Sequence, residues 1–429
     1  MPDFYTTCIE NRGGSLFIGG VSASALAEKF GTPLYVMDEQ RIRQNYLRLQ
    51  AALGRNYQKV RIHYAMKANS NLNVLKILNS EGAYIDAVSA NEALAALQAG
   101  FPKERVLFTG TNATGQELAV LAQNGIRVNI DSHSAFERLQ KIKKPEFISF
   151  RINPETGAGA HSHVITGGPD SKFGIWEADA VEAYARAKAA GVRTFGIHMH
   201  IGSNVLDVTD FTSALSRFMD IAGNISEKNK IKFEFIDIGG GLGVPYRPET
   251  SELDLDAYSN EIFEIFKAKL EEHGMGEPYF CVEPGRYIVA DAAVLLTRVN
   301  TLKQTPHMKF AGIDAGFNVL IRPAMYDSYH HILVDGKLDK KVTENYDVVG
   351  PICESGDFIA RNRKLPKLGE GDLLAVLTAG AYGYSMSSNY NLRARAAEVL
   401  VNQGKYELVR EPYTLEKILS GQKKAAWLQ

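Results

Sequence analysis

The strongest constraint on the fold is an alternation of strand-like and helix-like runs between residues 61 and 286. Short runs rich in β-branched and aromatic residues are separated by amphipathic or alanine-rich stretches, such as NLNVLKILNSE and ADAVEAYARAKAAG. This pattern predicts a parallel sheet, because each helix returns the chain to the start of the next strand. The strand-like runs are RIHYAM (from 61), AYIDAV (83), RVLFTG (105), RVNID (127), FISFRIN (147), TFGIHMH (194), FEFIDI (233) and YFCVE (279).

Eight such units predict an α/β fold, specifically a (β/α)8 TIM-type barrel. An open doubly wound sheet is the alternative, because it also alternates strands with helices. A ninth apolar run, PLYVMD from residue 33, precedes the barrel and can pair elsewhere.

After residue 286 the pattern changes to strand-like runs with few helices between them, such as KFAGIDAG from 309 and DLLAVLTAGAY from 372. We therefore expect a barrel over residues 34–286. Residues 1–33 and 287–429 are expected to form a second, mostly β domain. No Pro/Gly/Ser-rich linker separates the two parts.

Composition argues against a nucleic-acid-binding protein, a membrane protein and a disulfide-rich protein. The formal net charge of −1 provides no basic excess for nucleic acid or an anionic membrane. The N-terminus does not resemble a signal peptide, and no run approaches the roughly 18 apolar residues of a membrane span. Three scattered cysteines are too few for a disulfide framework or a zinc cluster. We expect a cytoplasmic protein that binds no metal.

Polar residues and glycines recur where the predicted strands end. In a TIM-type barrel, function is found at these carboxyl ends. Together, these strand-end residues predict one bound ligand that has an anionic group and a reactive centre. The residues are Lys67, Asp86, Arg151, His198, His200, Ser203, the GGGLG turn at 239–243, and Glu283 with Arg286 in EPGR.

Each of these residues also has an ordinary interpretation. Lys67 alone would be a solvated strand end, but burial near a barrel mouth would lower its pKa and free its amine for imine chemistry. His200 could stack on a planar cofactor or be a core histidine. Glu283 could bond a protonated ring nitrogen or form an internal ion pair with Arg286.

The GGGLG turn lets backbone N–H groups approach a phosphate, although a tight turn without a ligand is equally compatible. It lacks the dinucleotide spacing G-x-G-x-x-G, so a single phosphate fits better. In the second region, Cys353 beside Glu354 could be a proton donor and an ammonium ligand. An inert cysteine is the alternative.

Taken together, the motifs resemble the diaminopimelate decarboxylases, a family of fold type III (alanine-racemase-like) pyridoxal-phosphate enzymes. The resemblance runs in order from about Phe30 to Tyr390. It is carried by HYAMKANSN, SKFGI, HMHIGS, DIGGGLGV, EPGRYIVA, DAGFN, RPAMYDSYH, GPICESGD and GAYGYSM.

The resemblance implies pyridoxal 5'-phosphate as cofactor, bound covalently as an imine by Lys67. It implies that His200 stacks on the pyridine ring and that Glu283 pairs with the ring nitrogen. The other residues that it places around the cofactor are Asp86, Arg151, Ser203, Gly240, Gly241, Gly285, Arg286 and Tyr382.

The family's reaction converts meso-2,6-diaminopimelate to L-lysine and CO2 in the last step of lysine biosynthesis. The resemblance assigns Arg286, Arg322 and Tyr326 to the distal carboxylate of this substrate and Glu354 to its distal ammonium, with Tyr382 also at the substrate. Cys353 corresponds to the proton donor. Cys353 and Glu354 are implied to reach the neighbouring subunit's site, in an obligate homodimer.

One segment departs from the family pattern. The glycine-rich stretch 157–170 carries His161 and His163, which leaves fine substrate specificity open. A decarboxylase of a related amino diacid, an amino-acid racemase and a non-catalytic pyridoxal-phosphate carrier remain alternatives. Glu283 opposes the racemase, because racemases of this type place an arginine at the ring nitrogen. The second domain opposes a carrier.

Overall fold

The computed structural model describes residues 8–154 and 171–428. The chain divides into two compact units. The barrel unit comprises Arg43–Val244 and Ser251–Ile288. The β-rich unit comprises Met1–Ile42, Pro245–Thr250 and Val289–Gln429.

The barrel unit contains a closed ring of parallel strands, which confirms the predicted barrel and excludes the open sheet. The ring closes because β8 pairs with β9 and β13 pairs with β5. A short strand, β10 (Ile175–Trp176), adds to β9 outside the ring. The ring strands are β5 (Val60–Ala65), β6 (Tyr84–Ala87), β7 (Val106–Phe108), β8 (Arg127–Ile130), β9 (Phe147–Asn153), β11 (Thr194–His198), β12 (Phe233–Asp237) and β13 (Tyr279–Val282).

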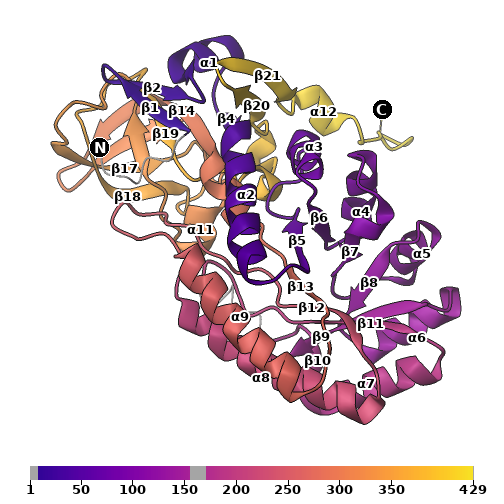
Figure 1. Ribbon diagram of the computed structural model, residues 1–429. Coiled ribbons are helices and arrows are strands. Elements are labelled where there is room, and N and C mark those ends of the chain that lie inside the picture. The colour runs from indigo at the N-terminus through magenta and orange to yellow at the C-terminus, as the bar shows by residue number, and fades with distance from the viewer. Residues whose placement is uncertain (1–7, 155–170, 429) are drawn as a thin grey trace. The chain divides into compact units, whose positions relative to one another are not determined.

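Helices surround these strands (Figure 1). Many begin at a residue whose side chain accepts a hydrogen bond from the first turn, which stabilises the helix start. At α5, Thr114 and Glu117 form a full capping box. The helices are α2 (Glu39–Asn56), α3 (Leu72–Ser80), α4 (Ala90–Gln98), α5 (Gly115–Gln123), α6 (His133–Ile142), α7 (Glu177–Ala189), α8 (Val208–Asn229), α9 (Leu255–Glu272) and α10 (Arg286–Val289).

The inside of the ring is only partly apolar. Leu107, Phe235 and Cys281 form a small buried cluster. Polar side chains fill other positions: Ser149 donates to Asn129 at 2.8 Å, and Glu234 on β12 accepts hydrogen bonds from one arginine on β5 and one on β8, strands that do not pair with β12. The barrel interior therefore contains charged side chains that pair with one another across the ring.

The β-rich unit is built on one large sheet and one small sheet. The large sheet has the order β18-β17-β15-β14-β4-β20-β21, with β19 pairing to β14 and β16 to β19. The small sheet has the order β1-β2-β3. The elements are β1 (Ile9–Arg12), β2 (Ser15–Ile18), β3 (Val21–Ser22), α1 (Ala23–Phe30), β4 (Leu34–Asp38), β14 (Ala293–Gln304), β15 (Lys309–Ile313), α11 (Arg322–Tyr326), β16 (Ile332–Val334), β17 (Glu344–Val349), β18 (Phe358–Leu365), β19 (Leu373–Val376), β20 (Ala397–Asn402), β21 (Lys405–Arg410) and α12 (Leu415–Leu419).

The strand β4 corresponds to the ninth apolar run of the sequence and belongs to the β-rich unit. It pairs antiparallel with β14 and parallel with β20, and all five of its residues are buried. Because both of its edges bond to strands from the C-terminal third, residues 34–42 group with the β-rich unit rather than with the barrel. The histidine-bearing segment 157–170 lies outside the described residues.

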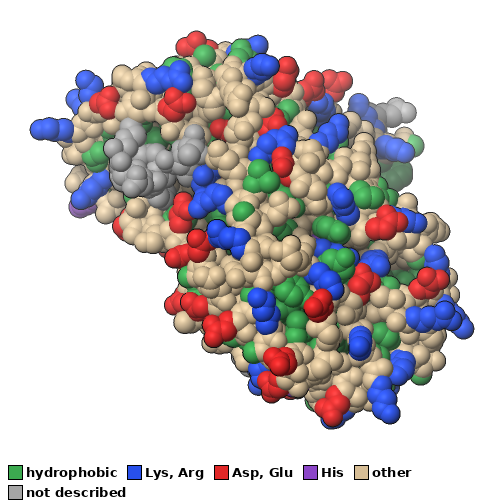
Figure 2. All heavy atoms as spheres, viewed as in Figure 1, with side chains coloured by type: hydrophobic (Ala, Val, Ile, Leu, Met, Phe, Trp, Pro, Cys, Tyr) green, Lys and Arg blue, Asp and Glu red, His purple; other side chains and the backbone are tan. Residues whose placement is uncertain are grey.

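Charges of both signs intermingle on the visible surface (Figure 2), and their numbers nearly cancel to the net charge of −1. The longest described helix, α8, carries charged residues along its length. No helix within residues 8–154 and 171–428 meets the length and hydropathy that a membrane span needs.

Tyr184 on α7 gives a test of how a helix is attached to the barrel. Its buried hydroxyl donates to Gly196 O at 2.6 Å and accepts from Phe150 N at 3.3 Å. Tyr184→Phe should therefore lower the free energy of unfolding by about 1–3 kcal/mol, because two backbone groups lose their partner. Urea denaturation measures this. Glu182→Ala on the same helix, which changes an exposed side chain, should have a far smaller effect; an equal effect would contradict the argument.

Candidate active site

The carboxyl ends of the barrel strands bring ionisable residues to one rim. His198 on β11 is in register with Arg151 on β9 and with Asp237 on β12. On the other side of the ring, Asp86 on β6 is in register with Ala65 on β5, two residues before Lys67. Because all the strands are parallel, residues far apart in sequence meet at this edge.

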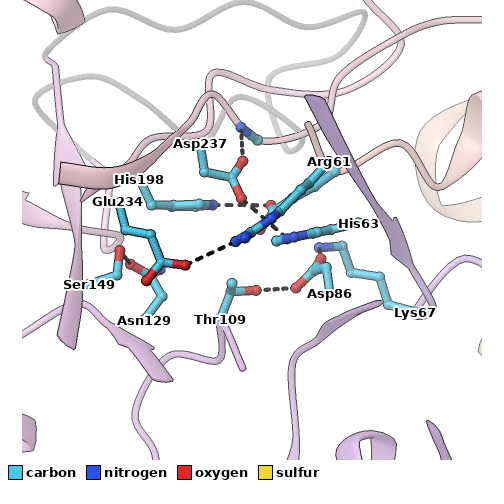
Figure 3. A network of polar contacts seen from close by, with 12 residues as sticks. Arg61, His63, Lys67, Asp86, Thr109, Asn129, Ser149, His198, Glu234 and Asp237 are labelled. Carbon is cyan, nitrogen blue, oxygen red and sulfur yellow. Dashed lines mark hydrogen bonds and ion pairs between the residues drawn. The ribbon is translucent and has the colours of Figure 1, made fainter. Parts of the chain in front are cut away.

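Lys67 is anchored through its amine. Its Nζ donates to Asp86 Oδ2 at 2.9 Å, and the hydroxyl of Thr109 donates to the other oxygen of Asp86 (Figure 3). Asp86 is fully buried, whereas the Lys67 side chain is 33% exposed. The amine is thus held in one direction and is still reachable from outside, as a covalent anchor for a ligand must be.

Glu283 follows β13 and is 2% exposed. Its Oε2 lies 3.1 Å from His198 Nε2. Its Oε1 accepts no hydrogen bond from any residue in the described ranges. A buried carboxylate oxygen without a donor is costly, so this atom marks a place where a ligand should donate a hydrogen bond.

The glycine-rich turn after β12 leaves no room for side chains. A Cβ on Gly240 would lie 2.4 Å from the carbonyl oxygen of Glu283, and one on Gly285 would lie 2.9 Å from Ala65 O. Nearby, Arg286 Nη2 donates to Ser203 Oγ at 2.9 Å, and Arg286 is buried. Bare backbone next to a guanidinium and a hydroxyl is a suitable binding site for one phosphate.

His200 lies two residues beyond the end of β11, and its Nδ1 accepts the N–H of Gly202 at 3.1 Å. Burial, with Arg151 and Lys67 nearby, holds the pKa of His200 well below its ordinary value. The Arg151 guanidinium lies 4.6 Å from the centre of the Phe173 ring. A neutral imidazole in this position can stack on a flat ligand without repelling the cations around it.

The remaining predicted site residues belong to the β-rich unit. Arg322 begins α11, is buried, and donates to Ser328 Oγ at 3.1 Å, while Tyr326 ends α11 and is half-buried. Cys353 and Glu354 are both exposed in a turn. Tyr382 has a positive φ of 56° and is also half-buried.

Sequence reasoning gave no role to several residues that the structure joins to this site. His198 was only one of the strand ends, and Thr109, Asp237 and His63 were not singled out. His198 and His200 are spaced two apart in HMH, and this spacing puts both on one face of an extended segment. That was the available signal for His198. The contacts of Asp237 with His63 and of Thr109 with Asp86 join different strands and leave no local signal.

Comparison with known proteins agrees with this geometry. Residues 39–290 match the family described as pyridoxal-dependent decarboxylase, pyridoxal binding domain. A diaminopimelate decarboxylase of Methanothermobacter thermautotrophicus is 53% identical, with 96% of each chain covered. Another, of Archaeoglobus fulgidus, is 41% identical and covers 97% of this chain and 98% of that one. The crystal structure of diaminopimelate decarboxylase from M. jannaschii in co-complex with L-lysine has a TM-score of 0.91 at 34% identity, with 99% of each chain covered.

The closed barrel, the mostly β second unit and the matched pyridoxal-binding domain define a fold type III pyridoxal-phosphate decarboxylase. The chain belongs to the diaminopimelate decarboxylase family. Its cofactor is pyridoxal 5'-phosphate. The residues present fit this cofactor, because Glu283 Oε1 lacks a donor, the glycine turn presents backbone without side chains beside Arg286 and Ser203, and the Lys67 side chain is one-third exposed.

The environment of His200 predicts its titration. In cofactor-free protein its imidazole should remain neutral below the ordinary histidine pKa of about 6.5, because burial and the neighbouring cations disfavour the imidazolium. NMR of ¹⁵N-histidine-labelled protein across pH 5–8 measures this, with His200→Gln to assign the signal. Titration of that signal near the ordinary value would contradict the described environment.

Proposed function

We propose that this enzyme decarboxylates meso-2,6-diaminopimelate to L-lysine and CO2, the last step of lysine biosynthesis. The observation that carries the proposal is the buried Glu283 carboxylate, which has one oxygen without a donor at the rim where Lys67 emerges. The curated relatives at 41–53% identity over nearly the whole chain, all described as diaminopimelate decarboxylases, support the same reaction.

Pyridoxal phosphate, when bound, accepts the electron pair that departing CO2 leaves on the substrate α-carbon. Glu283 would keep a proton on the ring nitrogen through Oε1, since a carboxylate stabilises the protonated ring. Lys67 would hold the cofactor covalently, and Asp86 would direct the Lys67 amine. A carboxylate at the ring nitrogen, where a racemase would carry an arginine, favours decarboxylation over racemisation.

The rest of the rim positions the cofactor. Backbone N–H groups at Gly240, Gly241 and Gly285, with Ser203 and Arg286, would bind its phosphate. His200 would stack its neutral ring on the pyridine, with Arg151 nearby. Tyr382 would add a further contact to the cofactor. These groups would hold the cofactor and the substrate in one orientation relative to each other.

Substrate recognition needs a site for each end of a diamino diacid. Arg286, Arg322 and Tyr326 would hold the distal carboxylate, because guanidinium groups bind carboxylates in a bidentate manner. Glu354 would bind the distal ammonium. Cys353 Sγ would then deliver a proton to the α-carbon after CO2 has left.

We further propose a homodimer in which Cys353 and Glu354 complete the partner subunit's site. Both side chains are exposed in the single chain, so they are available to a second copy. We also place the enzyme in the cytoplasm. The three cysteines, Cys8, Cys281 and Cys353, are all free, which suits a reducing compartment.

The substrate is tested by measuring CO2 release from meso-diaminopimelate, lysine, ornithine and arginine in parallel. Release should be fastest from meso-diaminopimelate, because only this substrate offers a second carboxylate to the arginines. Lys67→Ala, which removes the covalent anchor, is the control for background release. Faster release from lysine, ornithine or arginine would refute the substrate assignment.

Shared sites are tested by mixing two defective subunits. Cys353→Ala should lower kcat by about 10²- to 10⁴-fold, the usual contribution of a general acid. Equal mixing with Lys67→Ala subunits should recover about a quarter of wild-type activity, because half of the symmetric dimers then contain one intact site. Absence of recovery in verified mixed dimers would argue that each subunit forms its site alone.

A further inference from the structure

Behind Glu283 lies a histidine to which the proposed reaction gives no role. His198 ends β11, is 1% exposed, and places its Nε2 3.1 Å from Glu283 Oε2. The ligand atoms of His198, Asp237 and Glu283 all lie within 4.8 Å of one another. His198 contacts the oxygen of Glu283 that the cofactor would not use.

The buried acids of the rim have different partners. Asp86 has the Lys67 amine at 2.9 Å. Asp237 accepts the N–H of Gly239 at 2.8 Å and lies 3.6 Å from His63 Nδ1. Glu283 has His198. Three carboxylates cannot all be ionised at low dielectric, so the partners decide where the negative charge resides.

Between Asp237 and Glu283, the directions of the pKa shifts place the negative charge on Glu283. Burial, together with the nearby Glu283, raises the pKa of Asp237 well above its usual range. Burial also lowers the pKa of His63 to about 3, so His63 supplies no cation to Asp237. Burial of Glu283 opposes ionisation as well, but His198 and Lys67 outweigh it and bring the pKa of Glu283 below its ordinary value.

We propose that His198 is a positioning residue that holds Glu283 through Oε2, so that the carboxylate stays ionised with Oε1 directed to the cofactor's ring nitrogen. This inference rests on the proposed function, because it presumes that a pyridine ring binds opposite Oε1. A carboxylate with one oxygen fixed cannot rotate, and a polar contact in a dry site is stronger than in water. Without His198, Glu283 would lose the polar group nearest to its carboxylate, and burial would then favour the protonated acid, which cannot stabilise a protonated ring nitrogen.

The test uses His198→Phe, which keeps a flat ring but has no nitrogen, and His198→Gln, whose amide nitrogen reaches the same position as Nε2. Asn129→Leu is the matched control, because it removes a different buried polar contact inside the same barrel. The readout is the NMR signal of the ring nitrogen of ¹⁵N-labelled pyridoxal phosphate bound to each holoenzyme, which separates a protonated from a neutral ring.

The wild type, His198→Gln and Asn129→Leu should show a protonated ring nitrogen, and His198→Phe should shift the signal toward the neutral form. In His198→Phe, kcat should also fall about tenfold or more, the loss expected for one polar contact to a charged group. An unchanged signal in His198→Phe, or a neutral ring in His198→Gln, would overturn the inference. If His198→Phe does not fold, His198→Asn, whose amide is too short to reach Oε2, replaces it with the same expectations.

A second measurement separates this inference from the proposed function. In cofactor-free protein, infrared difference spectra against Glu283→Gln report whether Glu283 is ionised. We expect an ionised carboxylate in the wild type and a protonated one in His198→Phe; an ionised carboxylate in both would refute the role of His198. A wild-type protein that binds no pyridoxal phosphate would instead refute the proposed function, whatever the infrared result.

Discussion

Closure of the parallel barrel is the constraint on which the site depends. The pairing of β13 with β5 brings the strand that precedes Glu283 next to the strand that leads to Lys67, although the two residues are far apart in sequence. Because every ring strand runs in the same direction, all carboxyl ends meet at one rim. The site therefore needs no long loops, and short extensions of regular strands position its polar groups.

This arrangement has an energetic consequence. Charged groups buried inside a ring of strands lose their hydration, and the loss must be offset by partners within the protein. Lys67 with Asp86, and His198 with Glu283, are such pairs. Glu283 Oε1, by contrast, accepts no hydrogen bond from any of the described residues. This free acceptor favours binding of the cofactor, because the protonated ring nitrogen can donate the hydrogen bond that no group in the described ranges donates.

The sequence predicted the ring well because its strands are continuous apolar runs with helices between them, and each of the eight runs is a strand of the barrel. It was less informative about β4, whose short apolar run indicates a strand but not its neighbours. The pairing of β4 with β14 and β20 joins residues that are hundreds of positions apart. Such pairing depends on the order of strands in the sheet, which no local pattern encodes.

The sequence by itself determined the fold class and placed Lys67, His200, Glu283 and the glycine turn at strand ends, because periodicity and chain order fix where each strand stops. Only the tertiary structure decided the partners of these groups. Asp86 and Thr109 around Lys67, and His198 beside Glu283, come from different strands and are brought together by the register of the closed ring. The charge of a buried group is set by neighbours in space, and these neighbours become defined only when the ring has closed.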